Sequence, residues 1–202
     1  MEFGLSEDQV MLQETVRRFV AEEVLLDLVR QIAEGEIQVA ETLAEKLTAL
    51  GLDGLLVPEK DGGSGLGVLD AALVQECFGY GIVPARFLSN SVAAYALRDS
   101  GSSILNDIAN NDARFGIALN DFLSRRDGSG LSIRDEAVSG ASLMATDVAR
   151  STHLLFLAND TVRIGRAGSA EQVKTIDRTR EFSKVTITSF EQQITGAEVE
   201  KT

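Results

Sequence analysis

The sequence has one cysteine, one histidine, two prolines and no tryptophan. Because a disulfide needs two cysteines, Cys77 cannot form a bridge within the chain, which excludes a disulfide-stabilised secreted domain. The single histidine, His153, excludes metal or catalytic sites that need two histidines. No uncharged apolar run approaches the roughly 18 residues that a membrane-spanning helix needs. No secretory signal pattern is visible either, so we expect a cytoplasmic protein without a membrane span.

Basic side chains are outnumbered: 19 Lys and Arg stand against 31 Asp and Glu, which gives a formal net charge of −12. Residues 1–61 hold 14 acidic and 5 basic side chains, so most of the acidic excess lies in the first third. An acidic surface repels phosphate backbones, and the sequence has no basic stripe with interleaved aromatic residues. The composition therefore argues against a nucleic-acid partner. With 44% hydrophobic residues, the chain has enough apolar material for a core.

The N-terminal half has the apolar spacing of amphipathic helices. Ser6 and Gln9 have the spacing of a capping box, which predicts the start of a helix. Apolar residues then recur every three or four positions across residues 10–28, and we predict one helix there. A second helix is predicted over residues 37–50, ended by Gly51. Further helices are predicted over residues 70–78, from a cap at Asn90 or Ser91 to Gly101, and over residues 104–109.

Beyond residue 112, short β-prone segments alternate with turn residues. They lie at residues 115–119, 131–134, 154–158, 161–164, 173–176 and 184–190. We therefore predict an α+β fold, with an all-α helical domain over residues 1–111. A β-rich, small barrel-like domain is predicted over residues 112–202.

Few residues indicate chemistry by themselves. His153 precedes the apolar run LLFL, and we interpret it as a strand-edge residue without a catalytic role. Cys77 lies on a predicted apolar helix face, where we expect a buried small hydrophobe rather than a nucleophile. The glycines from Gly62 to Gly67 fit neither the G-x-G-x-x-G fingerprint nor a P-loop. We interpret them as a structural turn that allows two helices to pack closely.

Residues 51–67 read GLDGLLVPEKDGGSGLG, and residues 69–76 continue with LDAALVQE. This stretch resembles the acyl-CoA dehydrogenase family, whose members carry a G-L-x-G-L-x-V-P-E-x-x-G-G-x-G-L-G segment between N-terminal helices. The opening FGLSEDQ at residues 3–9 is similar to the family's first helix. Family members consist of an N-terminal helical domain, a middle β-domain and a C-terminal four-helix domain. The resemblance implies the first two of these domains here.

The same resemblance implies an FAD site on the middle domain. Family members carry a flavin-facing A-x-T-E segment and a G-x-K-x-W-[IV]-[ST] strand beside the isoalloxazine. The nearest segments are ALND at residues 118–121 and GASLMAT at residues 140–146. Four residues are therefore expected to face the cofactor: Leu119, Asn120, Met144 and Thr146.

Both segments depart from the family pattern. Asn120 and Asp121 stand where the family has Thr and Glu, and Ser142 and Met144 replace Lys and Trp. Asn120 and Thr146 retain hydrogen-bonding groups, and Met144 retains a soft contact to a ring. The alternative is an ordinary β-domain that binds no flavin.

The segment VKTIDRTR at residues 173–180 resembles the family's L-D-x-T-R-type turn, which precedes the final strand of the middle domain. Arg178 and Arg180 could face an anion in this turn. We interpret them instead as residues of a solvated turn.

The resemblance implies FAD-dependent α,β-dehydrogenation of an acyl-CoA thioester, in which a carboxylate takes an α-proton and the β-hydride passes to the flavin. In the family the catalytic glutamate lies in the C-terminal domain, so activity is expected only with a C-terminal portion or a partner chain. One alternative is a non-catalytic, degenerate subunit of a heteromeric acyl-CoA dehydrogenase in lipid or sterol catabolism; another is a truncated product without function. We expect a homo- or hetero-oligomer in which exposed apolar surface is covered.

Overall fold

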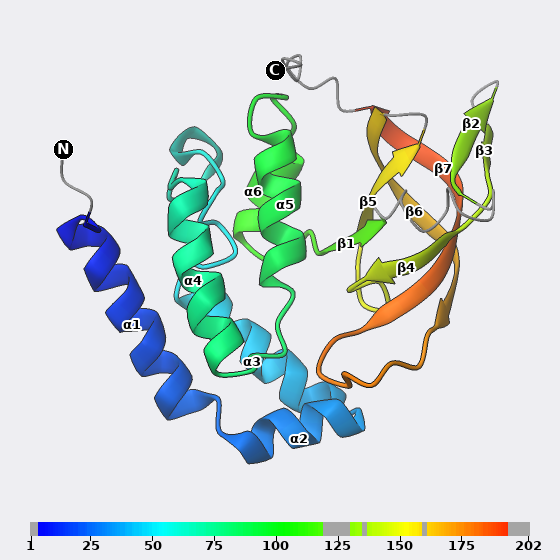
Figure 1. The fold of residues 1–202 in the computed structure, drawn as a ribbon. Helices are drawn as coiled ribbons and strands as arrows, with labels where there is room; N and C mark the ends of the chain where they lie inside the picture. Colours follow the sequence, from blue (N-terminus) through cyan, green and yellow to red (C-terminus); the bar gives the residue numbers. More distant parts are fainter. Residues whose placement is uncertain (1–3, 119–129, 135–136, 159–160, 194–202) are drawn as a thin grey trace.

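The computed structural model describes residues 4–118, 130–134, 137–158 and 161–193. Helices form the first part of the chain and strands the second, as Figure 1 shows, and this confirms the predicted α+β fold with its helical and barrel-like parts. In Figure 1, α1, α4 and α5 stand side by side, and α2 and α3 lie across their lower ends. Among the described residues, no helix is both long and apolar enough to cross a membrane.

The helical part contains six α-helices and one short 3-10 helix within the described residues. They are α1 (Glu7–Glu23), α2 (Leu26–Glu34), α3 (Ile37–Ala49), η1 (Glu59–Asp61), α4 (Val68–Tyr80), α5 (Phe87–Leu97) and α6 (Ile104–Ala109).

Two helix boundaries differ from the sequence prediction. The single helix predicted over residues 10–28 is interrupted at Val24 and Leu25, which have non-helical backbone angles. Val24 is buried at this bend, so the apolar spacing continues across it and hides it from a periodicity argument. Helix α5 starts at Phe87 instead of at a cap on Asn90 or Ser91, because the side chain of Asn90 is used in tertiary hydrogen bonds.

Five strands close into a barrel in the order β1-β4-β7-β6-β5. Strand β1 pairs parallel with β5, and the other barrel pairs are antiparallel. The barrel strands are β1 (Phe115–Ala118), β4 (Ser142–Thr146), β5 (His153–Ala158), β6 (Thr161–Gln172) and β7 (Phe182–Gln193). Strands β2 (Ser132–Arg134) and β3 (Ala137–Ser139) form a separate two-stranded sheet.

Strand β6 is longer than predicted, and residues 173–176 are not a strand. The sequence around Gly165, Gly168 and Ser169 suggests a turn, yet Gly165 and Ser169 pair with β7 and Gly168 lies at a β-bulge between them. A Cβ at Gly165 would lie 2.6 Å from the Ser189 carbonyl oxygen, and one at Gly168 would lie 2.5 Å from the Thr188 methyl carbon. The glycines therefore allow close strand approach at the β-bulges of this pair.

Two hydrophobic cores stabilise the fold. The larger core joins helical residues such as Leu97 and Ile108 to Phe115, Leu155 and Ile164 of the barrel strands. The smaller core fills the barrel interior with residues including Ala145, Leu154, Phe156 and Val185. Because one core spans both parts, the helices and the barrel stabilise each other.

The glycine-rich segment is a tight loop between η1 and α4. Gly62 and Gly65 have positive φ angles of 88° and 62°. A Cβ at Gly63 would lie 2.1 Å from the Val57 carbonyl oxygen, so only glycine fits there. The structural interpretation is correct, but the close approach is within the loop itself, rather than between two helices.

Candidate functional site

Strand β4 carries two of the predicted cofactor-facing residues. Ala145 is fully buried in the barrel core, and consecutive strand residues point to opposite faces. Met144 and Thr146 therefore lie on the outer face of the barrel, where both are partly exposed. Among the described residues, none forms a side-chain hydrogen bond with the Thr146 hydroxyl.

The other predicted segment lies next to this strand at its described end. Ile117 of β1 is the pairing partner of Thr146 on β4, so the C-terminal end of β1 borders the outer face of β4. Leu119 and Asn120, like Asp121, fall outside the described residues. Ser142 is buried and pairs with Val185, and the pairing shifts by a bulge between Ser142 and Ala145.

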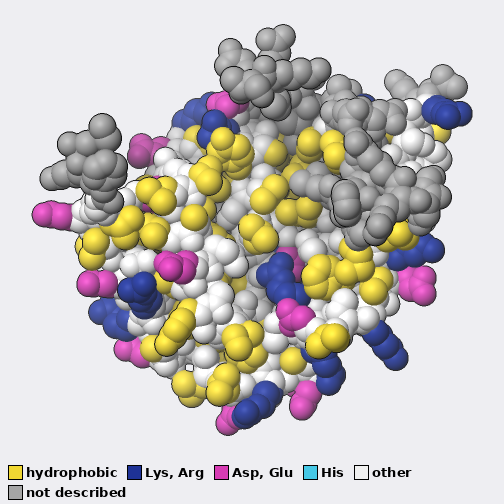
Figure 2. All heavy atoms as spheres, in the orientation of Figure 1, with side chains coloured by type: hydrophobic (Ala, Val, Ile, Leu, Met, Phe, Trp, Pro, Cys, Tyr) yellow, Lys and Arg dark blue, Asp and Glu magenta, His cyan; other side chains and the backbone are white. Residues whose placement is uncertain are grey.

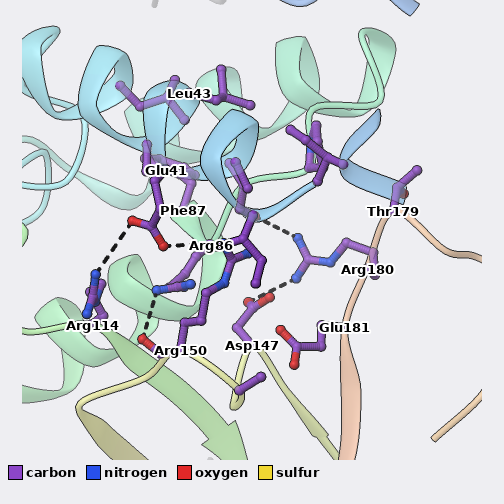
Figure 3. A pocket seen from close by; sticks show the side chains of 18 of the residues that line it. Glu41, Leu43, Arg86, Phe87, Arg114, Asp147, Arg150, Thr179, Arg180 and Glu181 are labelled. Atoms are coloured by element: carbon purple, nitrogen blue, oxygen red, sulfur yellow. Dashed lines mark hydrogen bonds and ion pairs between the residues drawn. The ribbon is translucent and has the colours of Figure 1, made fainter. Parts of the chain in front are cut away.

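A network of charged side chains connects the helices to the barrel, and Met144 and Thr146 of β4 are not part of it. Glu41 of α3 pairs with Arg150 at 3.3 Å and with Arg114 at 3.7 Å. Asp147, directly after β4, pairs with Arg180 at 3.2 Å and accepts a hydrogen bond from the Ser89 hydroxyl of α5. Figure 3 shows Glu41 and Arg114 on one side of Arg86, and Asp147 and Arg180 on the other.

Arg180 does not lie in a solvated turn. Its guanidinium donates to the Ala85 carbonyl oxygen at 3.0 Å as well as to Asp147. Arg178 is exposed, as predicted. The turn is organised by Asp177, whose carboxylate accepts hydrogen bonds from the hydroxyl and backbone N–H of Thr179, and these bonds lower the pKa of Asp177. These hydrogen bonds fix the turn so that the Arg180 side chain points inward.

Arg86 lies at the centre of the charged network. Its guanidinium donates to the Arg150 carbonyl oxygen at 3.3 Å and forms no ion pair with another described residue. Burial lowers the pKa of Arg86, and the nearby cations Arg150 and Arg114 lower it further, against the attraction of Asp147 and Glu41. Arg86 is therefore a partly buried cation among charges of both signs.

A second buried polar cluster lies beside this network. Asp53 accepts hydrogen bonds from the Thr48 hydroxyl at 2.6 Å and from the Asn90 amide at 3.2 Å. Burial raises the pKa of Asp53, and the hydrogen bonds from Thr48 and Asn90 offset only part of that effect. Asn90 also accepts a hydrogen bond from the backbone N–H of Phe115, at the start of β1.

These groups line a cavity of about 480 Å³ between α2, α3, the start of α5 and the barrel. Its lining combines apolar residues of α3, including Ile37, Leu43 and Leu47, with charged residues of both signs. In Figure 2, basic and acidic side chains lie together near the centre of the face, between the helices and the barrel. The volume is within the range of roughly 300–1,000 Å³ that is typical of ligand pockets.

His153 and Cys77 have side chains of chemically reactive types, and the contacts of both indicate a structural role. His153 stacks on Phe115 at 5.3 Å between ring centroids and contacts the Thr152 hydroxyl at 2.8 Å. Cys77 is buried, as predicted, and burial raises the pKa of its thiol. Across the described residues, no group of three or more potential metal ligands occurs.

The arginine cluster was not predicted from the sequence, because its members come from four separate segments. Arg114 and Arg150 do carry a weak signal: each lies within a few residues of a predicted buried strand, where a charged side chain needs a partner. Arg86 has no such signal, because it follows Pro84 and Ala85 in a predicted loop.

The profile of the acyl-CoA dehydrogenase N-terminal domain family matches residues 6–107, which is half of the chain. A curated relative, the acyl-CoA dehydrogenase IpdE2 of Mycolicibacterium smegmatis, is 34% identical over 98 residues, covering 48% of this chain and 32% of the relative.

Solved structures share the fold at low sequence identity. The Tcur3481-Tcur3483 steroid ACAD G363A variant is similar with a TM-score of 0.74 and 22% identity, over 91% of this chain and 57% of that chain. The ChsE4-ChsE5 complex from Mycobacterium tuberculosis is similar with a TM-score of 0.71 and 17% identity, over 96% of this chain and 57% of that chain. An acyl-CoA dehydrogenase complexed with FAD from Bacillus anthracis is similar with a TM-score of 0.70 and 18% identity, over 92% of this chain and 36% of that chain.

This chain thus spans less than two thirds of each of these relatives. The fold similarity to the three solved structures extends through the barrel, beyond the segment that the family profile matches. With helices α1 to α6 followed by the closed barrel, the chain belongs to the acyl-CoA dehydrogenase family and carries its N-terminal and middle domains.

Proposed function

We propose that this chain forms the N-terminal and middle parts of a cytoplasmic, FAD-dependent acyl-CoA dehydrogenase. The complete enzyme removes an α-proton and a β-hydride from an acyl-CoA thioester and leaves a trans-2-enoyl thioester. The C-terminal portion that carries the general base belongs to the same polypeptide or to a partner chain. The observation that carries the proposal is the outer face of β4, where Met144 and Thr146 stand partly exposed beside the end of β1.

The described residues of this face fit a flavin ring in two respects. Thr146 offers a hydroxyl that no described side chain engages, and such a group can donate to a ring nitrogen or accept from a ring N–H. Met144 offers a polarisable thioether, which contacts aromatic rings favourably. FAD, when bound, supplies the acceptor for the hydride. In this proposal Leu119 and Asn120 complete the cofactor-facing set, as expected from the sequence.

A titration of the purified protein with FAD tests this proposal, both for the chain alone and after co-expression with the C-terminal helical domain of a relative. We expect saturable binding that Thr146→Val weakens about fivefold, because a net hydrogen bond contributes about 1 kcal/mol. The matched control is Thr188→Val, an exposed threonine on β7. The proposal is wrong if FAD does not bind in either form, or if the two valine variants bind it equally well.

The second candidate is a non-catalytic subunit that supports a longer acyl-CoA dehydrogenase chain. Ser142 and Met144 stand where the family has Lys and Trp, which favours this candidate. The similar structures also include a steroid ACAD and the ChsE4-ChsE5 complex. An exposed apolar surface also lies where α1, α2 and α4 meet, with Leu25 at 61%, Leu26 at 60% and Tyr80 at 94% exposure. The steroid enzyme supports a sterol-derived acyl group as an alternative to a fatty acyl chain.

Co-purification from the native host separates the two candidates. A supporting subunit is expected to elute with a longer dehydrogenase chain and to lose that partner when Tyr80 is changed to Lys, whereas Lys60→Glu, at another exposed site, is expected to retain it. Recovery of a homo-oligomer alone would count against the supporting role.

A further inference from the structure

The cavity between the helices and the barrel contains a cation, Arg86, that forms no ion pair within the described part of the chain. Arg114 and Arg150 share the single carboxylate of Glu41, and Arg180 is paired with Asp147. Arg86 lies between these pairs, and its guanidinium forms one hydrogen bond with the described residues, to the Arg150 carbonyl oxygen. In addition, the Nε atom of Arg114 is buried and has no hydrogen-bond partner among the described residues. Buried donors of this kind are normally satisfied, so an acceptor is missing here.

Asp53 does not supply that acceptor. Asp53 lines the same cavity, but its oxygens accept from Thr48 and Asn90, and burial raises its pKa. Guanidinium groups are suited to carboxylate and phosphate oxygens, because their planar N–H donors match the spacing of two oxygens.

The cavity lining also has apolar residues. Among them are Leu43 and Leu47 of α3, together with Phe78 and Phe87. A ligand that fills about 480 Å³ therefore has both hydrocarbon and guanidinium groups available for contact. This lining suits an amphiphile with one anionic end.

We propose that this cavity binds a ligand that carries a carboxylate or phosphate on an apolar body, with the anionic group at Arg86 and the apolar body against α3. The cavity is distinct from the proposed flavin surface, since neither Met144 nor Thr146 lines it. The proposal goes beyond the dehydrogenase function and does not depend on FAD binding.

Calorimetric titration of the purified protein with octanoate, octyl phosphate and octanamide tests the proposal. We expect saturable binding of octanoate, octyl phosphate or both, and binding of the neutral octanamide at least about tenfold weaker, because it cannot form charge-assisted hydrogen bonds. Comparison of the two anions identifies which head group the site prefers. This comparison uses the unmodified protein, so it does not depend on any variant folding.

Variants at the two ends of α5 provide the matched test. Arg86→Gln is expected to weaken binding of the preferred anion about tenfold or more, and Arg86→Lys, which keeps the charge, is expected to weaken it less. Arg98→Gln, at the other end of the helix and outside the cavity, is expected to change the affinity less than about twofold. Far-UV circular dichroism and the urea midpoint establish that each variant is folded.

Three results would overturn the proposal: no binding of either anion, equal binding of octanamide and the anions, or unchanged affinity in a folded Arg86→Gln variant. The FAD titration is an independent measurement on the same protein. Loss of anion binding with intact FAD binding would therefore overturn this inference alone, and the reverse result would overturn only the flavin site.

Discussion

Buried polar residues connect the two parts of this fold. Asn90 and Asp147 each join a helix of the N-terminal domain to a barrel segment, through hydrogen bonds to Phe115 and Ser89. Asp147 also has a positive φ angle of 57°, a conformation that Asp and Asn adopt more readily than most residues. At both positions the side chain satisfies a buried polar partner, so a residue of different shape leaves that partner without a hydrogen bond.

Asp53 gives a pH-dependent prediction. Because folding raises its pKa above the ordinary value of 3.8, the folded protein binds this proton more tightly than the unfolded chain does. The stability contributed by Asp53 therefore increases as the pH falls through its raised folded pKa, and decreases as the pH rises. We expect the free energy of unfolding of the wild type, relative to Asp53→Asn, to increase from neutral to mildly acidic pH.

Urea unfolding of both proteins across that range measures the difference, and effects of other carboxylates cancel in the comparison. A difference that stays constant, or that decreases as the pH falls, would contradict the assignment.

Some residue roles could be predicted from the sequence and others could not. Ser6 and Gln9 form the predicted capping box, because its hydrogen bonds join residues three positions apart. The ligand-facing position of Arg86 depends on Glu41 and Arg150, which are distant in the sequence, so no local pattern indicates it. The roles of Met144 and Thr146 were expected only from family resemblance, although their outward orientation follows from strand alternation about Ala145.

Among the elements, α4 has an unusual C-terminal turn. The N–H of Val83 donates to the Phe78 carbonyl oxygen at 2.9 Å, and the N–H of Ile82 donates to the Gly79 carbonyl oxygen at 3.3 Å. These two bonds form a Schellman motif, in which the left-handed position is usually glycine. Here Ile82 occupies that position with a φ angle of 52°, which is strained for a β-branched residue.

Ile82→Gly is therefore expected to stabilise the protein by about 1 kcal/mol, because relief of backbone strain exceeds the cost of a more flexible unfolded chain. The side chain of Ile82 is 50% exposed, so little burial is lost. The urea midpoint measures this change. Ile82→Ala keeps a Cβ at the strained position and serves as the control, with a smaller gain. If Ile82→Gly is destabilising, the Ile82 side chain contributes more through contacts than the strain costs.

Element boundaries were predictable where a local signal ends the element. Helix α6 has the predicted bounds, and α3 ends one residue before the predicted position, close to Gly51. The break after α1 has no glycine or proline, and strand β6 continues through two glycines. In both places packing against distant segments determines the backbone, and a propensity argument does not contain that information.

For the whole molecule, the Asn90 hydrogen bonds test how far the helices and the barrel depend on each other. Asn90→Ala removes the acceptor of the buried Phe115 N–H and a donor to Asp53. We expect a loss of about 2 kcal/mol, because a buried donor without a partner keeps its desolvation cost. Ser91→Ala, at the adjacent buried position, is expected to cost less than about 1 kcal/mol.

Hydrogen exchange of amides in α5 and in β5 measures whether the loss is shared. Equal decreases in protection are expected in both elements, since one hydrophobic core includes residues of each. A decrease confined to α5 would mean that the barrel is stable without the helices.

The closed order of the barrel strands also limits how this protein can associate. In an open sheet the outermost strands present unpaired backbone groups, to which another chain can add without regard to its sequence. In the described barrel each strand already has two neighbours, although β6 beyond Gly165 pairs with β7 alone. Where both edges of a strand are paired, partners must recognise the barrel through side chains, and single substitutions there can change which partner is accepted.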